Sequence, residues 1–290
     1  MPSVFLLTAT AHACAVCACG DPTLTSMGAE QPFAGRRRLA LEATSRTDAV
    51  GQAGVDQVQL RDDALTASLA VSPHDRWQLA VSVPVGRRIA EDVSLARTTV
   101  WSLGDATARA RWVGVRTAGQ GSVLAGLGGG LRLPTAPVVR APDGTPLAMS
   151  AQLGAGQPTA IFGGWGFASR GGWSTYGSVE GWQPVAAWTR AAFDSEPGRS
   201  ARSTVALQWQ PRVRVALRGS LEGRVDAVAT LDGAPEPDTG GGIVFSRADL
   251  IVSPATDLVV QAGLSVPTVQ ALHGHHTEGV SAALGVTRDF

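Results

Sequence analysis

The sequence predicts an all-β protein, an antiparallel transmembrane β-barrel of about twelve strands with a short N-terminal extension. Three observations predict this fold. Polar and apolar residues alternate along many short segments, turn-forming clusters come in two alternating lengths, and no run of eighteen apolar residues could span a bilayer as a helix. The 290 residues, 44% of them hydrophobic and 17% charged, suit a single barrel domain.

The clearest alternation occupies residues 212–226, where arginine, serine and acidic residues alternate with valine and leucine. Side chains of a strand point to opposite faces with period two, so one face is charged and the other apolar. A continuous charged face needs water and an apolar face needs lipid, as in a barrel with a wet lumen. A sandwich strand with one solvated side is the alternative. The same period recurs in residues 77–85, 103–112, 202–210 and 258–266.

Charged side chains of both signs are expected to line the lumen. The residues assigned to it are Glu42, Asp105, Arg109, Arg111, Arg214, Arg218, Glu222 and Arg224. Because unpaired like charges in a confined space are unfavourable, this mixture predicts ion pairs across the lumen. A small barrel filled in this way is a narrow or gated path and not a general pore.

Turn-forming residues predict short turns and longer loops in alternation. Short turns are expected near residues 72–76, 116–121, 169–172, 210–212 and 253–257. Longer loops are expected near residues 47–56, 89–98, 134–150, 190–200, 226–242 and 272–278. These connections separate twelve strands and put both termini on the short-turn side, which faces the periplasm in bacterial barrels. Ten or fourteen strands remain alternatives, because boundaries inferred from sequence err by a few residues.

The aromatic residues support the same orientation. Trp77 and Trp173 follow short turns, and Trp112 and Trp209 precede them, as expected for an aromatic girdle at the membrane–water interface. Tryptophan in an ordinary sandwich core is the alternative. The alternating final segment ends at Phe290 and resembles the terminal strand that barrel-assembly machinery recognises.

Residues 1–13 are predicted to be a shortened export signal, because a short apolar stretch ends in the cleavable pattern Ala11-His12-Ala13. Residues 14–35 follow as a cysteine-bearing segment that lies in the periplasm or plugs the lumen. Residues 36–290 form the barrel. The expected location is therefore the outer membrane of a Gram-negative-type bacterium, with outer-membrane lipid and the assembly machinery as partners.

The three cysteines, Cys14, Cys17 and Cys19, form a C-x2-C-x-C cluster. Thiolates are preferred ligands of Cu(I) and Zn(II), and copper is favoured because it accepts two or three soft donors. The alternatives are a thiol–disulfide pair, a lipidated Cys14, or membership of a cleaved leader.

His273, His275 and His276 lie in the expected loop between the last two strands. Imidazole suits copper, zinc and nickel, and this spacing allows two rings to share one ion. A hydrated external loop is the alternative. Metal bound at both clusters would place ions at the two mouths of the barrel.

Two function classes are disfavoured. The formal net charge is zero, which removes the electrostatic case for a nucleic-acid partner. The sequence contains no G-x-S-x-G, H-E-x-x-H, P-loop or G-x-G-x-x-G motif, so an enzyme is not expected.

Four motifs within residues 100–290 resemble, in their order, the phenol-degradation MetA-pathway family of outer-membrane transporters. They are Leu103-Gly104-Asp105, the strand end Gly130-Leu131-Arg132-Leu133-Pro134-Thr135, Leu153-Gly154-Ala155-Gly156, and Leu264-Ser265-Val266-Pro267 followed by Gly274 and the strand to Phe290. Ala136 stands where that family has a glycine. The resemblance implies passage of small, often hydrophobic molecules across the outer membrane, without naming a solute or transferring transport residues.

The sequence thus favours a barrel for passage of small solutes, with the thiol cluster indicating soft-metal handling and a small molecule or metal ion as solute. The alternative is a metal-binding or redox protein that uses the barrel as an anchor. Neither the metal nor the oligomeric state is fixed by the sequence.

Overall fold

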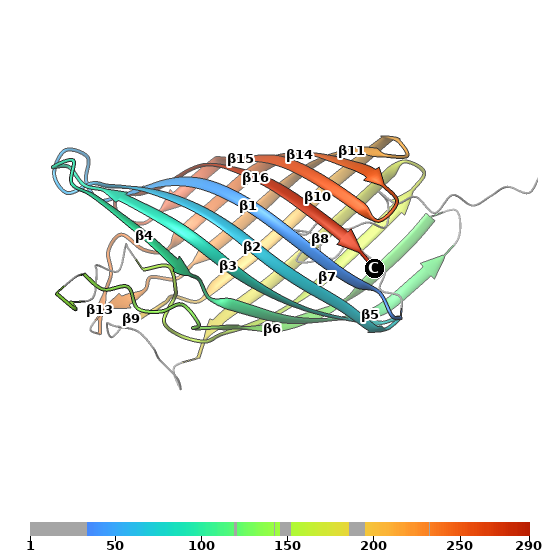
Figure 1. Ribbon diagram of the computed structural model, residues 1–290, viewed down its shortest axis with the longest axis horizontal. Helices are drawn as coiled ribbons and strands as arrows, with labels where there is room; N and C mark the ends of the chain where they lie inside the picture. Colours follow the sequence, from blue (N-terminus) through green and yellow to red (C-terminus); the bar gives the residue numbers. More distant parts are fainter. Residues whose placement is uncertain (1–33, 119–120, 142, 146–151, 186–194, 232) are drawn as a thin grey trace, which may run out of the picture.

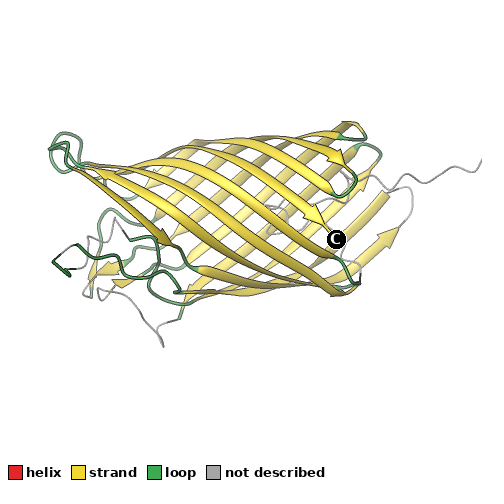
Figure 2. Cartoon of the chain, viewed as in Figure 1, coloured by secondary structure: helices red, strands yellow, loops and turns green. Residues whose placement is uncertain are grey.

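The computed structural model describes residues 34–118, 121–141, 143–145, 152–185, 195–231 and 233–290, and these form a β-barrel (Figures 1 and 2). The strands are β1 (Arg37–Val50), β2 (Val58–His74), β3 (Trp77–Glu91), β4 (Arg97–Leu103), β5 (Ala106–Ala118), β6 (Gly121–Leu133), β7 (Thr159–Arg170), β8 (Trp173–Pro184), β9 (Ser195–Glu196), β10 (Ser200–Arg212), β11 (Val215–Asp226), β12 (Thr230–Leu231), β13 (Ala234–Pro235), β14 (Gly241–Ala255), β15 (Leu258–Leu272) and β16 (His276–Asp289). Within these residues no helix is long and apolar enough to cross a membrane.

One sheet of thirteen strands closes on itself, because its edge strand β2 also pairs with β3. β4 and β5 pair with successive parts of β3 and form one barrel strand that is interrupted at Gly104 and Asp105. The barrel therefore has the predicted twelve antiparallel strands. Three short strands, β9, β12 and β13, form a separate small sheet in the long loops.

The chain ends meet where β1 pairs with β16. The backbone N–H of Phe290 donates to the carbonyl of Arg37, and Arg38 forms an ion pair of 2.6 Å with Asp289. Arg36 pairs with the same carboxylate. Both ends of the barrel chain therefore lie at the rim that carries the short turns (Figure 1).

The connections follow the predicted alternation of short turns and longer loops. Short turns join β2 to β3, β7 to β8, β10 to β11 and β14 to β15, each within a few residues of its predicted position. Residues 119–120, which join β5 to β6, lie outside the described residues. The longest connections follow β6, β8 and β11, again as predicted.

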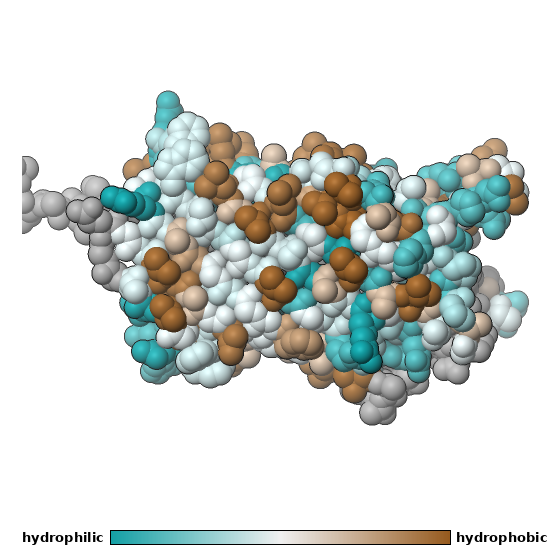
Figure 3. Space-filling model, turned by 180° about the vertical axis from the view of Figure 1, so that it is seen from behind, coloured by the Kyte–Doolittle hydropathy of each residue, from teal (hydrophilic) through white to brown (hydrophobic). Residues whose placement is uncertain are grey.

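Large apolar side chains face outward along nearly every strand. Leu65, Leu69, Val205, Leu221 and Leu284 are among them and remain 49–64% exposed. Figure 3 shows apolar side chains spread over the barrel wall. Residues with the opposite parity face the lumen, as the period of a strand requires.

Three of the four girdle tryptophans are exposed on the outer wall beside the short turns. Trp77, Trp173 and Trp209 are 43–51% exposed, and Trp173 stacks on Trp209 with ring centroids 6.0 Å apart. Trp112 pairs with Trp77 across β3 and β5 and is partly buried. The clustering at this rim therefore agrees with the sequence-based prediction.

Candidate functional site

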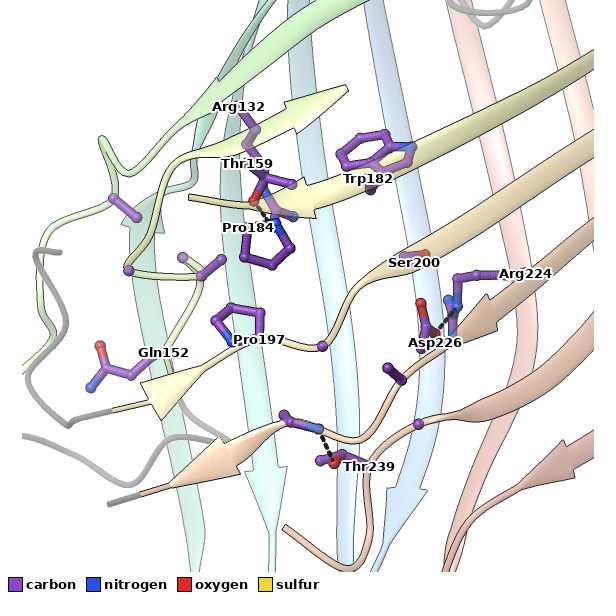
Figure 4. A pocket seen from close by; sticks show the side chains of 18 of the residues that line it. Arg132, Gln152, Thr159, Trp182, Pro184, Pro197, Ser200, Arg224, Asp226 and Thr239 are labelled. Carbon is purple, nitrogen blue, oxygen red and sulfur yellow. Dashed lines mark hydrogen bonds and ion pairs between the residues drawn. The ribbon is translucent and has the colours of Figure 1, made fainter. Parts of the chain in front are cut away.

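The lumen contains a series of cavities that narrows toward the short turns. A cavity of about 380 Å³ lies at the long-loop end (Figure 4). A second cavity, of about 290 Å³, shares Trp182, Arg202 and Arg224 with the first. A third, of about 20 Å³, shares Arg109 and Glu180 with the second. Shared lining residues thus connect the three cavities, and the open volume decreases from the long-loop end toward the short turns.

Trp182 is the aromatic centre of the wide end. Three guanidinium groups approach its ring, with Arg202 at 3.9 Å, Arg109 at 5.3 Å and Arg132 at 5.6 Å from the centroid. The indole N–H donates to Glu180 at 3.2 Å, which fixes the ring plane. Cation–π contacts of this kind hold guanidinium groups without neutralising them.

Two of the nearby arginines are neutralised by carboxylates. Arg109 forms a two-point ion pair with Glu180, with N–O distances of 2.6 and 3.2 Å. Arg224 pairs with Asp226 at 2.5 Å and also with Glu278 of β16, a strand separated from β11 by β14 and β15. The mixed charges of the lumen therefore form ion pairs between strands that are not neighbours.

Arg132 and Arg202 differ from this pattern. Arg132 donates to the hydroxyl of Thr159 at 3.0 Å, and neither guanidinium has a carboxylate within 4.0 Å among the described residues. The Nε–H of each is buried and without a hydrogen-bond partner among those residues. Both line the wide cavity, so its positive charge is only partly balanced.

Near the short turns the lumen is filled instead. Val113, Leu124, Phe167, Tyr176 and Ala206, together with Trp165, form a buried apolar cluster inside the barrel wall. Arg111 stacks on Trp165 at 4.0 Å from the ring centroid. A Cβ on Gly126 would lie 3.2 Å from the Trp165 ring and far too close to the Trp112 carbonyl, so glycine is required there.

An ion-pair cluster accompanies this apolar filling. Asp249 accepts from Arg218 at 2.8 Å and from Arg247 at 2.8 Å, and the Arg218 and Asp249 side chains are 2% and 0% exposed. A carboxylate between two guanidinium groups at such burial makes a tight cross-strand contact.

The sequence-assigned lumen residues occupy three kinds of position. Arg109, Arg111, Arg218, Glu222 and Arg224 face inward, and Glu42 lies on the inward face of β1 opposite Thr66. Arg214 does not line the lumen, because it lies exposed in the two-residue turn between β10 and β11. The alternating segment 212–226 therefore comprises the last residue of β10, this turn and the whole of β11.

Asp105 is hydrogen-bonded to the connection between β6 and β7. Its two carboxylate oxygens accept from the backbone N–H of Ala136 at 3.2 Å and of Ala155 at 2.7 Å. Thr135 bridges the same junction by accepting from Ala106 and donating to the Gly104 carbonyl. The connection after β6 is thereby fixed against the interrupted strand β4–β5, where it contributes Gly154 and Ala155 to the wide cavity.

The predicted metal ligands fall in different parts of the chain. Cys14, Cys17 and Cys19 lie outside the described residues. His273 and His275 are exposed in the turn before β16, while His276 borders the wide cavity with its Nε2 4.0 Å from Glu278. The described part of the chain brings together no group of three His, Cys, Asp or Glu side chains suited to a metal. A copper or zinc site stays a prediction.

Sequence reasoning did not single out Trp182, Glu180, Arg132 or Arg202. Within the alternating segment 202–210, Arg202 shares a face with Thr204, Gln208 and Gln210, so the alternation indicates the direction of its side chain. The contact between Arg202 and Trp182 depends on the pairing of β8 with β10, in which Ser200 lies opposite Trp182. Local sequence carries no signal for that register across a long loop.

Comparison with known proteins bears on the fold. No family model matches the chain, and no curated protein matches it. Among solved structures, the COG4313 outer membrane channel from Pseudomonas putida F1 is similar, with a TM-score of 0.70 at 16% identity over 89% of this chain and 96% of that one. The translocator domain of autotransporter NalP from Neisseria meningitidis gives a TM-score of 0.52 at 14% identity, over 92% of this chain and 94% of that one. The chain therefore has the closed antiparallel barrel fold found in these outer-membrane proteins.

Proposed function

We propose that this protein is an outer-membrane channel through which small solutes pass along the lumen. The observation that carries the proposal is the narrowing series of cavities, about 380, 290 and 20 Å³, inside a barrel with an apolar outer wall. A polar lumen behind a lipid-facing wall is the arrangement of membrane barrels that conduct solutes. Its narrow end selects small solutes over large ones.

The proposed orientation puts the short turns and both barrel termini in the periplasm and the long loops outside the cell. Short periplasmic turns and longer external loops are the rule for bacterial barrels. Outer-membrane lipid and barrel-assembly machinery are the partners this orientation implies. Solutes then enter by the wide cavity and meet the constriction near Tyr176 last.

Reconstitution of the full chain tests the channel function. Single-channel recording in planar bilayers and swelling of liposomes in sugars of increasing size should show small, size-limited permeation. Tyr176→Ala, which removes a ring from the narrowest cavity, should raise conductance several-fold, whereas Trp173→Ala on the outer face of the same strand should not. Permeation no greater than through protein-free membranes, in both wild type and Tyr176→Ala, contradicts the proposal.

Soft-metal handling by the cysteine cluster is a second proposal, favoured by the C-x2-C-x-C spacing. In its alternative form the barrel anchors a metal-binding or redox segment without transporting a solute. Metal analysis of the detergent-purified protein and of a Cys14→Ser/Cys17→Ser/Cys19→Ser variant tests it. Stoichiometric copper or zinc that is lost in the variant supports it, and equal metal content in the two proteins contradicts it.

A further inference from the structure

The wide cavity carries positive charge that its own side chains do not balance. The guanidinium carbon of Arg202 lies over the Trp182 ring at 3.9 Å from its centroid, and Arg132 approaches the same ring. Among the described residues, the hydrogen-bond partner of Arg132 is a neutral hydroxyl, that of Thr159. Figure 4 shows Arg132, Thr159 and Trp182 on one side of this cavity. Guanidinium groups that are partly buried without an anion are costly unless water or a ligand anion supplies the missing partner.

The carboxylates around the cavity are already engaged. Asp226 and Glu278 pair with Arg224, and Glu180 pairs with Arg109. Asp105 accepts two backbone N–H groups, and Asp238 accepts from the backbone N–H of His275 at 2.7 Å. Among the described residues, no carboxylate oxygen therefore contacts Arg132 or Arg202, and their guanidinium groups are the ones that a ligand anion can pair with.

Apolar surface borders the same space. Val138, Pro184, Pro197 and Leu272 line the cavity, and Figure 4 shows Pro184 and Pro197 near Arg132. These side chains have no hydrogen-bond donor to offer a solute. A volume of about 380 Å³ falls in the lower range of small-molecule sites, about 300–1,000 Å³.

We propose that the wide cavity is a binding site for a small organic carboxylate with a compact apolar body. The carboxylate is held between the guanidinium groups of Arg132 and Arg202, and the apolar body rests against the proline-lined wall. The contact with Trp182 holds the Arg202 guanidinium in place, and its terminal amino groups can donate to a carboxylate. The proposal rests on the channel function proposed above and names small organic carboxylates as the class of solute.

Binding of a charged probe and a neutral one of the same shape tests this site. Isothermal titration of the folded full chain in detergent would use benzoate and benzamide. Wild type should bind benzoate at least about tenfold more tightly than benzamide, because a charge-assisted pair adds more than 1.4 kcal/mol, the equivalent of tenfold. The double variant Arg132→Gln/Arg202→Gln should lose this preference.

Arg97→Gln is the control for the substitution itself, because it replaces one exposed arginine of β4 on the long-loop side, outside the lining of the cavity. Circular dichroism would verify that each variant retains its strand content. Equal affinity for benzoate and benzamide in wild type, or an unchanged preference in the double variant, overturns the carboxylate site.

Liposome swelling with a small neutral sugar separates this site from the channel itself. Sugar permeation that persists in the double variant while benzoate preference is lost supports both proposals. Permeation without benzoate preference in wild type overturns only the carboxylate site. Benzoate preference without permeation of any solute overturns the channel and leaves the site as a binding pocket.

Discussion

The lumen near the short turns and the lumen near the long loops balance their charges differently. Near the short turns, Asp249 sits between Arg218 and Arg247 with no exposed surface, and an apolar cluster fills the adjoining space. Near the long loops, Arg132 and Arg202 border an open cavity and have no carboxylate within ion-pair distance in the described part of the chain. One half is packed around buried ion pairs, and the other is open and contains two guanidinium groups that have no carboxylate partner among the described residues.

The same strands therefore serve two roles, one at each end of the barrel. β10 and β11 contribute Ala206 and Arg218 to the packed half, and Arg202 and Arg224 to the open half. The packed half can hold the barrel together, since its ion pairs and its apolar side chains are buried. The open half can interact with a solute, since part of its charge is not satisfied by the protein. We expect mutations in the packed half to lower the stability of the barrel and mutations in the open half to change its selectivity.

Removing the carboxylate of the packed half should have the largest effect. Asp249→Asn leaves the guanidinium groups of Arg218 and Arg247 without their shared anion and should lower the free energy of unfolding by about 3–5 kcal/mol. Urea unfolding in lipid vesicles, followed by tryptophan fluorescence, would measure it. Asp226→Asn is the control in the open half and should cost much less, because Arg224 keeps Glu278. Equal losses of unfolding free energy in the two variants would contradict the assignment of stability to the packed half.

Truncation within the apolar cluster comes next. Leu124 is 2% exposed, so Leu124→Ala leaves a cavity in the cluster and should lower the free energy of unfolding by about 2–5 kcal/mol. Leu127→Ala on the same strand is the matched control, because Leu127 lies on the outer face and is 61% exposed. The outer variant should lose less than half as much stability in the same unfolding assay. A larger loss at Leu127 would mean that the lipid face, and not the cluster, stabilises the barrel.

The barrel itself was predictable from local chemistry. Proline, glycine and aspartate mark the turns because they adopt the backbone angles that turns require, and this spacing gives twelve strands. The error at Arg214 has a physical cause. The turn lies at Val213 and Arg214, just after its expected position near residues 210–212. Because these two residues continue the polar–apolar alternation of β11, the pattern assigns Arg214 to the lumen-facing side of a strand.

The candidate site was predictable only in part. Alternation indicates that Arg202 faces the lumen, but it does not indicate which strands face each other across it. That depends on barrel closure and on register across long loops, such as the connection between β8 and β10. The role of Asp105 also depended on contacts with Ala136 and Ala155, far along the chain. Pairing between distant segments was therefore the missing information.

Selectivity should respond only to charge in the open half. Arg202→Glu replaces a lumen cation beside Trp182 with an anion and should lower the ratio of anion to cation permeability several-fold. Reversal potentials under a potassium chloride gradient would measure this ratio. Arg212→Glu is the control at the short-turn end of the same strand, where the side chain is exposed, and should leave the ratio nearly unchanged. A similar shift in both variants would indicate a general surface-charge effect.

The smallest expected effect concerns a loop at the open end. Hydrogen bonds lower the pKa of Asp92: the Ser94 hydroxyl donates at 2.6 Å, and the backbone N–H groups of Ala96 and Ser94 donate at 3.1 and 2.8 Å. A carboxyl whose pKa is lowered by folding adds stability above its unfolded pKa, and this stability is lost as the pH falls through the folded pKa.

Ser94→Ala should therefore raise the pKa of Asp92 toward its ordinary value, while the pKa of Asp143, lowered chiefly by the Thr145 hydroxyl, should not change. Titration of side-chain carboxyl carbons by NMR in detergent would measure both. The change in barrel stability should be very small, because Asp92 is fully exposed and contacts only its own loop. If Ser94→Ala instead changed the dependence of the unfolding free energy on acidic pH markedly, this loop would contribute to the stability of the barrel. The packed half would then not be the sole source of that stability.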